Sequence, residues 1–540
     1  MGMYLNSKVP YESCKAVTSG KYFVDKSDLI AELIPALGTE ERLFCITRPR
    51  RFGKSVMANM IGAFFGNAAD SSSIFCQLHI AESEDYQNYQ NQYNVISIDF
   101  SRIPRNCHSY TEYINRIQDG INQDLSDAYP EFVFGQSEAV WDHLQLLFEK
   151  KMEKFIFVID EWDAPFHMSF ITESDQKDYL LFLKSLLKGQ AYIDLAYMTG
   201  VLPIAKYSSG SELNGFQEFD MAMSTRFGSY FGFLDSEVDR LYEKYLQTTE
   251  KPRITRDALT DWYDGYHTAS GDRIYNPRSI IYALMNNQLK NYWTNSGPYD
   301  EIFYYIKHNI DAVRDDLAWM ISGEGVEADM QEYAATAAEL NTRDQIYSAM
   351  VVYGLLTYNE QNGKFYIPNK ELMDKFNELL LSNESLGYVN RLAKRSAEML
   401  KATLSGDTQK MAEILKYAHD TESPIFSYNS EIELSAVVNL VYLAARDQYR
   451  VEREDKAGEG FVDFIFYPER RNTDGIMLEL KIGSTPEDAI RQIKDKNYAL
   501  RFQGKLGEQP KYTGNILAVG ISYSRKTKEH YCKVERLQPG

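Results

Sequence analysis

A chain of 540 residues, of which 44% are hydrophobic and 25% charged, has the composition of a folded globular protein, and its length favours two or three domains over one. The formal net charge of -19 argues against a protein that coats nucleic acid over its whole surface, because phosphate binding depends on Lys and Arg. The basic residues gather at one end, where residues 491–540 contain 11 Lys or Arg and 4 Asp or Glu. A polyanion would bind there, although a solvated basic helix and tail is the alternative.

The N-terminal sequence lacks the apolar run of a signal peptide, and no stretch approaches the roughly 20 apolar residues that cross a bilayer. We therefore expect a soluble, cytoplasmic protein that has no membrane partner. The five cysteines are scattered, with no CxxC pair and no Cys/His spacing that suits zinc. This pattern predicts reduced thiols, most of them buried.

Short apolar runs alternate with helical stretches from about residue 21 to residue 233. The runs LFCITR, NVISIDF, KFIFVID and DLAYMTG are each typical of a strand that is buried on both faces. Strands of this kind separated by helices indicate a parallel sheet flanked by helices. We expect an α/β domain over residues 1–233.

The first of these strands runs directly into the loop RPRRFGKS, which is followed by a helix with apolar positions every three to four residues. A phosphate-binding loop has this context, because backbone N–H groups and a helix N-terminus face the anion. Gly53, Lys54 and Ser55 match the glycine, the lysine that supplies charge and the hydroxyl that binds Mg²⁺. The general pattern GxxxxGK[ST] has glycine at position 48, where this chain has Arg48, so the match is partial.

Two further strands end on polar residues. KFIFVIDEWDAP ends a strand on Asp160 and Glu161, where a carboxylate that holds Mg²⁺ through water and a base that polarises the attacking water are expected. The strand DLAYMTG ends on Thr199, where such folds often place a γ-phosphate sensor. An acidic pair at a strand end is also commonly a cap or an ion-pair partner, but the three features in this order favour nucleotide binding.

The middle region, residues 234–427, is mainly helical. One hairpin, LLTYNEQNGKFYIP, interrupts it, and Asn362 and Gly363 are expected to supply the positive φ angles of a tight turn. The predicted helix YSAMVVYGLL precedes the hairpin. This arrangement fits a winged-helix module or simply a wing on a helical lid.

From residue 428 to residue 540 the predicted order is helix, three strands, helix, strand. The strands are YRVERE, GFVDFIFYP and IMLELKIG, and NILAVGISYS closes the set as a buried strand. The helix TPEDAIRQIKDKNYALRF opens with Thr485 as its N-cap and Pro486 at its first position.

Two carboxylates and a lysine lie on adjacent strands of this region. Asp463 belongs to GFVDFIFYP, and strand alternation puts Glu479 and Lys481 of IMLELKIG on one face. Such carboxylates can bind a divalent ion, and the lysine can stabilise charge on an attacked phosphate, as a metal-dependent phosphodiesterase requires. The alternative is that Glu-x-Lys is merely a solvated face of an edge strand.

The chain resembles the bacterial AAA-ATPase-like proteins that carry a PD-(D/E)xK nuclease domain at their C-terminus, on the segments KYFVDKSDLI, ITRPRRFGKS, VIDEWDAP, MTGVLPIAK, WYDGYHTASGDRIYNPRSI and LELKIG. The resemblance covers nearly the whole chain, and that family usually writes its loop as RPRRFGKS, so Arg48 is no departure within it. It implies a P-loop NTPase over residues 1–233, a helical lid over 234–427 and a restriction-endonuclease-like α/β domain over 428–540.

The resemblance also implies ATP and Mg²⁺ at the first site. The nucleotide-binding residues would be those of the loop, with Asp160 and Ser55 on the metal and Glu161 as the catalytic base; the loop residues concerned are Arg51, Gly53, Lys54 and Ser55. AAA-type sites are often completed by an arginine of a neighbouring subunit, which would make the protein a homo-oligomer, and Arg226 is one of several candidates.

For the C-terminal site the resemblance implies Mg²⁺ or Mn²⁺ on Asp463 and Glu479, with nucleic acid as the partner. Glu433 would be a further metal ligand, although Glu431 could take its place, and Gln492 would position metal or phosphate. The order helix, three strands, helix, strand also resembles the nuclease core. For four residues of the WYDGYHTASGDRIYNPRSI segment the resemblance implies only a recognisable motif, and we expect a packing role; they are Trp262, Tyr266, Asn276 and Pro277.

Three functions are compatible with these features. The first is an enzyme in which ATP binding and hydrolysis control a nuclease. The second is an ATP-dependent regulatory or interaction protein whose nuclease fold binds nucleic acid or a partner without cutting, and the third is a nucleotide-binding scaffold without turnover. Retention of Glu161, and of Asp463, Glu479 and Lys481 together, favours the first.

Overall fold

A computed structural model describes residues 2–84, 86–135, 138–204, 213, 215–294, 306, 310–330, 340, 342–420, 431–457, 460–468, 470, 472–495 and 514–537. The chain divides into two compact units. One contains Met1–Tyr299 and Glu327–Leu372, and the other contains Asp300–Val326 and Met373–Gly540. The division into three domains at residues 233 and 427 stays a prediction.

The first unit is built on a parallel sheet of five strands. Its strands are β1 (Leu43–Thr47), β2 (Asn94–Asp99), β3 (Phe155–Asp160), β4 (Ile193–Gly200) and β5 (Gln217–Phe219), in the order β2-β3-β4-β1-β5. The four apolar runs identified in the sequence form β1 to β4. The short edge strand β5 was not predicted, because three residues are too few to show a period.

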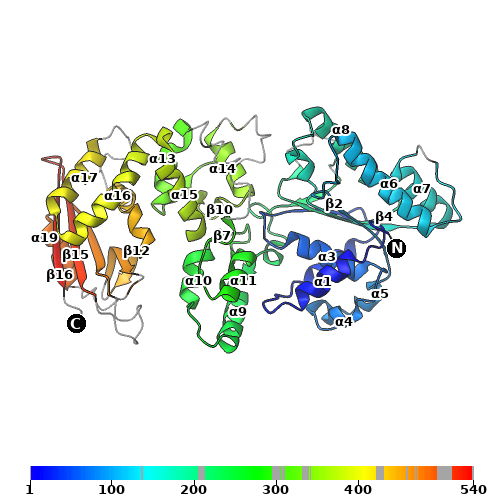
Figure 1. Ribbon diagram of the computed structural model, residues 1–540, viewed down its shortest axis with the longest axis horizontal. Helices are drawn as coiled ribbons and strands as arrows, with labels where there is room; N and C mark the ends of the chain where they lie inside the picture. The colour runs from blue at the N-terminus through cyan, green and yellow to red at the C-terminus, as the bar shows by residue number, and fades with distance from the viewer. Residues whose placement is uncertain are drawn as a thin grey trace. The chain divides into compact units, whose positions relative to one another are not determined.

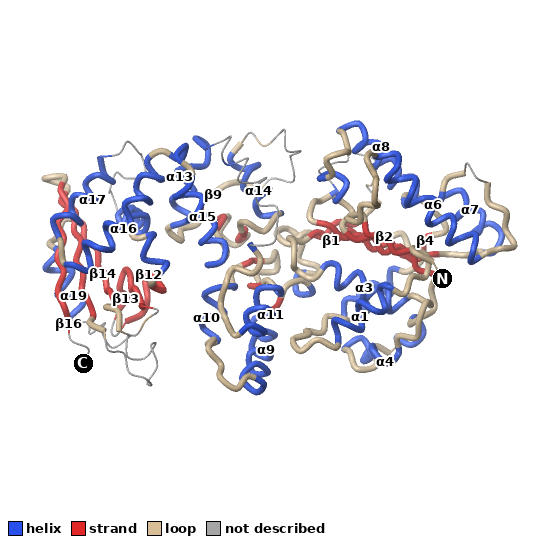
Figure 2. The backbone as a smooth tube through the Cα atoms, viewed as in Figure 1, coloured by secondary structure: helices blue, strands red, loops and turns tan. Residues whose placement is uncertain are grey.

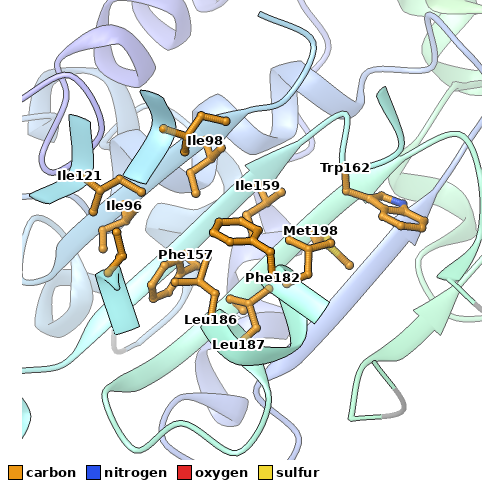
Figure 3. Packing of buried hydrophobic residues seen from close by; sticks show 14 of the residues in the cluster. Ile96, Ile98, Ile121, Phe157, Ile159, Trp162, Phe182, Leu186, Leu187 and Met198 are labelled. Carbon is orange, nitrogen blue, oxygen red and sulfur yellow. The ribbon is translucent and has the colours of Figure 1, made fainter. Parts of the chain in front are cut away.

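Helices cover both faces of this sheet (Figure 1). On one face, α3 (Lys54–Phe65) buries Met57, Ile61 and Phe64, spaced along one helical face, against the sheet beside α1 (Val9–Thr18). On the other face, Phe157, Ile159 and Met198 pack against α8 and its neighbours (Figure 3). The helices of this second layer are α6 (Tyr110–Ala128), α7 (Val140–Lys151) and α8 (Glu173–Leu187). Burial on both faces explains why the strands read as continuous apolar runs.

The rest of the first unit consists of short helices and small sheets. The helices are α2 (Asp28–Leu33), α4 (Ser72–Phe75), α5 (Tyr86–Tyr89), α9 (Asp235–Thr248), α10 (Arg256–Tyr263), α11 (Pro277–Asn286) and α14 (Arg343–Val352). One sheet has the order β6-β8-β7, made of β6 (Phe233–Leu234), β7 (Tyr266–His267) and β8 (Arg273–Tyr275). The other has the order β10-β11-β9, made of β9 (Val326–Glu327), of which Glu327 belongs to this unit, β10 (Thr357–Asn359) and β11 (Lys364–Tyr366).

The predicted hairpin is present, with a different turn. β10 and β11 pair antiparallel, with Asn359 opposite Lys364, so four residues form the loop. Of the two turn residues proposed from the sequence, only Gly363 has a positive φ, of 67°. The longer loop needs one left-handed residue, whereas a two-residue turn of type I′ would need two. The predicted helix before the hairpin is α14, and the choice between winged helix and simple wing stays open.

The second unit carries the C-terminal sheet, seen as a red group of strands next to α16, α17 and α19 (Figure 2). Its strands run in chain order, with β14 and β15 parallel and the other pairs antiparallel: β12 (Tyr449–Ala457), β13 (Gly460–Pro468), β14 (Gly475–Ile482), β15 (Ile516–Ser524) and β16 (Glu529–Leu537). Its helices are α13 (Ile310–Ile321), α16 (Tyr388–Ser405), α17 (Thr408–Asp420), α18 (Glu431–Val441) and α19 (Pro486–Asp495), and α15 (Lys370–Ser382) begins in the first unit.

Two sequence expectations for this region need correction. β15 does not close the set, because β16 follows it as an antiparallel strand, which the alternation of His530, Cys532 and Val534 with polar residues could have indicated. Most cysteines are not buried either: Cys14 and Cys45 are, while the other three are partly or fully exposed; all five are free thiols. Across the described residues, the helices are too short or too polar to cross a bilayer.

Candidate nucleotide and nuclease-type sites

The loop between β1 and α3 has the backbone of a predicted phosphate loop. Arg51 and Gly53 have positive φ angles, 73° and 99°, so the chain reverses sharply before the helix begins at Lys54. The Lys54 side chain is only 3% exposed, and its Nζ donates to the Pro49 carbonyl at 3.2 Å. The same Nζ lies 4.0 Å from Oε1 of Glu161. The predicted lysine and base therefore face each other across the loop.

The end of β3 brings the predicted metal ligands together. The Asp160 carboxylate accepts a hydrogen bond from the Ser55 hydroxyl. Burial raises the pKa of Asp160 to about 6; the Ser55 hydrogen bond and the charge of Lys54 oppose this rise, whereas the charges of Glu161 and Asp99 add to it. Asp99 ends β2 directly opposite Asp160 and was not identified from the sequence. A hard divalent cation prefers oxygen ligands such as the Asp160 carboxylate and the Ser55 hydroxyl, and its charge would favour the ionised form of Asp160.

Hydrogen bonds from the residues that follow β3 connect the predicted base, Glu161, to the end of β4. Glu161 has a positive φ of 50°, a conformation uncommon for a residue with a side chain. The next residue holds it there, because the Trp162 backbone N–H donates to the Thr199 carbonyl at 3.0 Å and its indole N–H donates to the Leu202 carbonyl at 2.9 Å. Asp163 adds a third tie by accepting from the Leu202 N–H at 2.8 Å. Sequence reasoning missed this role for Trp162 and Asp163, although both lie in the motif VIDEWDAP.

Thr199 is placed as expected for a sensor. It lies on β4, between the strands that lead to the phosphate loop and to Glu161, and it is fully buried. Within the described part of the chain, its hydroxyl has no hydrogen-bond partner. A buried hydroxyl without a partner is costly, so a phosphate oxygen at this edge of the sheet would satisfy it.

Arg48 explains the departure from the general loop pattern. Its side chain is 1% exposed, and its guanidinium donates to the carbonyls of Thr47 and Phe219 at 2.8 and 2.7 Å and to that of Phe227 at 3.2 Å. It also lies 5.0 Å from the Phe231 ring centroid. Arg48 thus anchors the loop to the segment after β4. Burial lowers the pKa of Arg48 to about 10, so it stays charged near neutral pH.

The second predicted site lies where β13 and β14 separate. Phe464 pairs with Leu478, and beyond that pair the Asp463 carboxylate accepts from the Leu480 N–H at 2.6 Å. On β14, Nζ of Lys481 lies 2.9 Å from Oε1 of Glu479. The structure therefore brings the two carboxylates and the lysine together. Their neighbours Leu478 and Leu480 are buried, as the predicted alternation requires.

Gln492 also reaches this site, because α19 packs closely on the sheet. Gln492 donates to Oε1 of Glu479 from the middle of α19. Gly520 of β15, which pairs with Glu479, permits the approach: a Cβ there would lie 2.3 Å from the Pro486 carbonyl oxygen. The predicted N-cap is confirmed, since Thr485 Oγ1 accepts from the Asp488 N–H at 3.2 Å.

Glu479 has the properties of a metal ligand. Its side chain is 3% exposed, and its Oε2 has no hydrogen-bond partner among the described residues. Burial raises the pKa of Glu479 to about 7, with a further rise from the charge of Asp463, while Lys481 opposes both. An ionised carboxylate left with a buried, unmatched oxygen is unfavourable, so the site favours a bound cation.

Other predicted residues are not drawn into the sites. Among the described residues, no three His, Cys, Asp or Glu gather closely enough for one ion, so Glu433 on α18 is not grouped with the C-terminal pair and stays a prediction. Much of the basic segment, residues 496–513, lies outside the described residues. Arg226 lies 4.6 Å from the Phe227 ring centroid and 3.6 Å from Glu32 Oε2, so its role toward a neighbouring subunit stays a prediction.

Comparison with known proteins assigns both regions. Residues 13–209 match the family described as "Predicted AAA-ATPase", and residues 435–530 match the "PD-(D/E)XK nuclease superfamily". An uncharacterized protein in the vnfD 5′ region of Azotobacter chroococcum mcd 1 is 24% identical over 534 residues, which cover 94% of each chain.

Two solved structures are similar at a lower level. A Walker-type ATPase of Pyrococcus abyssi is 12% identical, with a TM-score of 0.36, and the match covers 65% of this chain and 94% of that one. The ORC2 protein of Aeropyrum pernix is 12% identical, with a TM-score of 0.34, and the match covers 70% of this chain and 95% of that one. Likeness at this level carries no detail to the present chain. On the family matches, the chain contains a predicted AAA-ATPase-like domain over residues 13–209 and a domain of the PD-(D/E)XK nuclease superfamily over residues 435–530.

Proposed function

We propose that the N-terminal site binds ATP with Mg²⁺ and hydrolyses it. The observation that supports this most is the convergence of Lys54, Ser55, Asp160 and Glu161 at the carboxyl ends of β1 and β3. Lys54 would hold the phosphates, while Ser55 and Asp160 would hold Mg²⁺, which neutralises phosphate charge when bound. Glu161 would orient and deprotonate the attacking water, and Thr199 would contact the terminal phosphate.

Two variants separate binding from turnover at this site. Lys54→Ala removes the charge on the phosphates and should weaken ATP binding, whereas Glu161→Gln keeps the shape of the base and should leave binding largely intact while abolishing hydrolysis. Calorimetric titration with ATP and Mg²⁺, paired with phosphate release, measures both. Hydrolysis at the wild-type rate in both variants would refute the assignment.

The C-terminal site is proposed to cut nucleic acid phosphodiesters with Mg²⁺ or Mn²⁺. Asp463 and Glu479 would hold the metal, which would polarise the phosphate and activate water when bound. Lys481 would stabilise charge on the attacked phosphate, and Gln492 keeps Glu479 oriented through its hydrogen bond. The buried, unpartnered Oε2 of Glu479 is the observation that favours a cation here over a purely structural ion pair.

Metal binding and cleavage should respond differently to variants of this site. Asp463→Ala and Glu479→Ala should each lose both stabilisation by Mn²⁺ and cleavage, because they remove metal ligands. Lys481→Ala should lose cleavage and keep most of the stabilisation. Calorimetry with and without Mn²⁺, together with labelled single- and double-stranded DNA and RNA, distinguishes these outcomes. Normal metal binding with no cleavage of any substrate would favour the second function, an ATP-dependent regulatory protein whose nuclease fold binds without cutting.

We further propose that the nucleotide state of the first site controls the second. One chain that contains both domains supports such control, since an independent nuclease has no need of an ATPase. Homo-oligomerisation through an arginine of a neighbouring subunit belongs to the same proposal. Sedimentation with and without ATP tests it.

A further inference from the structure

Residues far away in the sequence contact the phosphate loop at three positions. The Trp293 indole N–H donates to the Arg50 carbonyl at 3.0 Å. The Phe52 ring meets the Tyr266 ring edge to face, with centroids 5.0 Å apart and planes at 87°. Pro49 is approached so closely by Gly354 that a Cβ there would lie 2.7 Å from the Pro49 Cβ. Three residues of the loop are therefore held from outside.

The residues that grip the loop also contact one another. The Tyr266 hydroxyl donates to the Gly354 carbonyl at 3.0 Å, and its ring lies 6.2 Å from that of Trp293 at 86°. Gly354 has a φ of 78°, which fits glycine and brings its backbone against both rings. Tyr266, Trp293 and Gly354 thus form one cluster, which we call the loop clamp.

Glu371 fixes Trp293 within this clamp. Its carboxylate is 1% exposed and accepts from the Trp293 N–H at 2.5 Å and from the Ser279 hydroxyl at 2.7 Å. The backbone N–H groups of Tyr292 and Thr294 also donate to it. Such a set of donors around one carboxylate fixes the backbone that carries Trp293. Glu371 lies in the first turn of α15, in which the chain passes from the first unit to the second.

The loop clamp gives a role to two residues of the WYDGYHTASGDRIYNPRSI segment, for which only packing was expected. Tyr266 belongs to the loop clamp directly. Asn276 caps α11 by accepting from the Ser279 N–H at 3.3 Å, and Ser279 in turn holds Glu371. Tyr266 therefore acts on the loop through Phe52, and Asn276 acts on it through Ser279, Glu371 and Trp293, beyond their expected packing role.

The hydrogen bond to Arg50 bears on phosphate binding through peptide geometry. In a trans peptide the C=O and the following N–H point in opposite directions. Tying the Arg50 carbonyl to Trp293 therefore points the Arg51 N–H away from Trp293. A loop that cradles phosphate needs its N–H groups turned inward and its carbonyls turned outward. Holding one carbonyl outward in advance lowers the cost of ordering the loop around an anion.

We propose that Trp293, held by Glu371, is a positioning residue for the phosphate loop, and that nucleotide binding at the loop is transmitted to the loop clamp. The inference rests on the proposed binding of ATP at this loop. Because coupling is reciprocal, a clamp that favours the bound loop is itself favoured by bound nucleotide.

Trp293→Phe tests this in the full chain, since it removes the indole N–H and keeps an aromatic ring. The probe is a non-hydrolysable ATP analogue with Mg²⁺, followed by calorimetry and by tryptophan emission. The loss of one buried hydrogen bond should weaken analogue binding by about fivefold to tenfold. The KM for ATP should rise while kcat stays within about twofold, because Glu161 is untouched. Analogue binding should change tryptophan emission in the wild type, and Trp293→Phe should reduce that change, leaving only the response of the other tryptophans, among them Trp162 beside Glu161.

Trp262→Phe is the matched control, because it makes the same chemical change outside the loop clamp. Trp262 packs on Tyr263 and Lys370. This control should keep both the affinity and the emission change. Glu371→Gln is a second variant, in which the amide presents donors to groups that already donate, and it should weaken binding in the same direction.

The outcomes separate the two proposals. A wild-type chain that binds no analogue overturns the proposed ATP site, and this inference with it. A wild type that binds, with unchanged affinity and an unchanged emission response in Trp293→Phe, overturns only the inference. If Trp293→Phe does not fold, Glu371→Gln decides, and an unaltered affinity there overturns the role of the clamp.

Discussion

Glu479→Gln should stabilise the metal-free protein at alkaline pH and abolish its response to metal. At about 1.4 kcal/mol per pKa unit, a pKa raised from 4.5 to about 7 makes ionisation of Glu479 about 3 kcal/mol costlier in the folded protein than in the unfolded chain. The folded state binds this proton more tightly, so the free energy of unfolding should fall as the pH rises from about 4.5 to about 7, and then level off.

Glutamine carries no charge, so the variant does not have this free-energy cost of ionisation in the folded state. In the presence of a chelator at pH 8, the domain that contains Glu479→Gln should therefore be more stable than wild type by up to about 3 kcal/mol, and the two should converge near pH 4.5. Added Mn²⁺ should stabilise the wild type most at pH 8 and leave the variant unchanged, because metal binds the ionised carboxylate.

The assay is calorimetric unfolding of the full chain at several pH values, with chelator or with Mn²⁺. Glu487→Gln is the control, because it makes the same charge change in the same region at an exposed carboxylate, 3.6 Å from Lys533. That variant should show no gain at pH 8. If Glu479→Gln is no more stable than wild type at pH 8 without metal, the electrostatic reasoning about this site is wrong.

Two further variants test how the sites are positioned. Trp162→Phe removes the indole donor to the Leu202 carbonyl and should slow ATP hydrolysis about threefold to tenfold while ATP affinity stays unchanged, as measured by phosphate release and calorimetry. The control is Trp141→Phe, which changes a partly buried tryptophan on α7. Equal hydrolysis rates in the two variants would contradict the role of Trp162. Gly520→Ala places a methyl 2.3 Å from the Pro486 carbonyl oxygen, so α19 must shift. The domain should therefore lose about 1–3 kcal/mol of stability along with much of its stabilisation by Mn²⁺. If the variant unfolds and responds to Mn²⁺ as the wild type does, close packing of α19 is not needed.

Local patterns were sufficient for much of the fold. The four buried strands of the first sheet were recognisable because burial on both faces leaves continuous apolar runs. Strand alternation predicted that Glu479 and Lys481 lie on one face of their strand, opposite the buried Leu478 and Leu480. The Thr485 cap and the hairpin were also predictable, because helix caps and turns depend on residues that are neighbours in the sequence. β16 has an alternating pattern that makes it predictable from the sequence, whereas β5 is too short to show one.

Contacts between distant segments could not be predicted in this way. The guanidinium of Arg48 is held by carbonyls of residues 171 and 179 positions further along the chain. Trp293 reaches the Arg50 carbonyl across 243 positions. No periodicity encodes such partners, because they depend on how packed elements bring loops together. The tie from Trp162 to Leu202 is of the same kind, with a separation of 40 positions.

The most direct test of the central proposal is whether ATP controls cleavage by the same chain. Labelled single- and double-stranded DNA and RNA are incubated with Mn²⁺, with and without ATP, using wild type, Glu161→Gln and Lys481→Ala. We predict that ATP changes the cleavage rate of the wild type, that Glu161→Gln alters this dependence without removing the nuclease site, and that Lys481→Ala cuts nothing under either condition. Cleavage at one rate with or without ATP, in both wild type and Glu161→Gln, would contradict control of the nuclease by the ATPase.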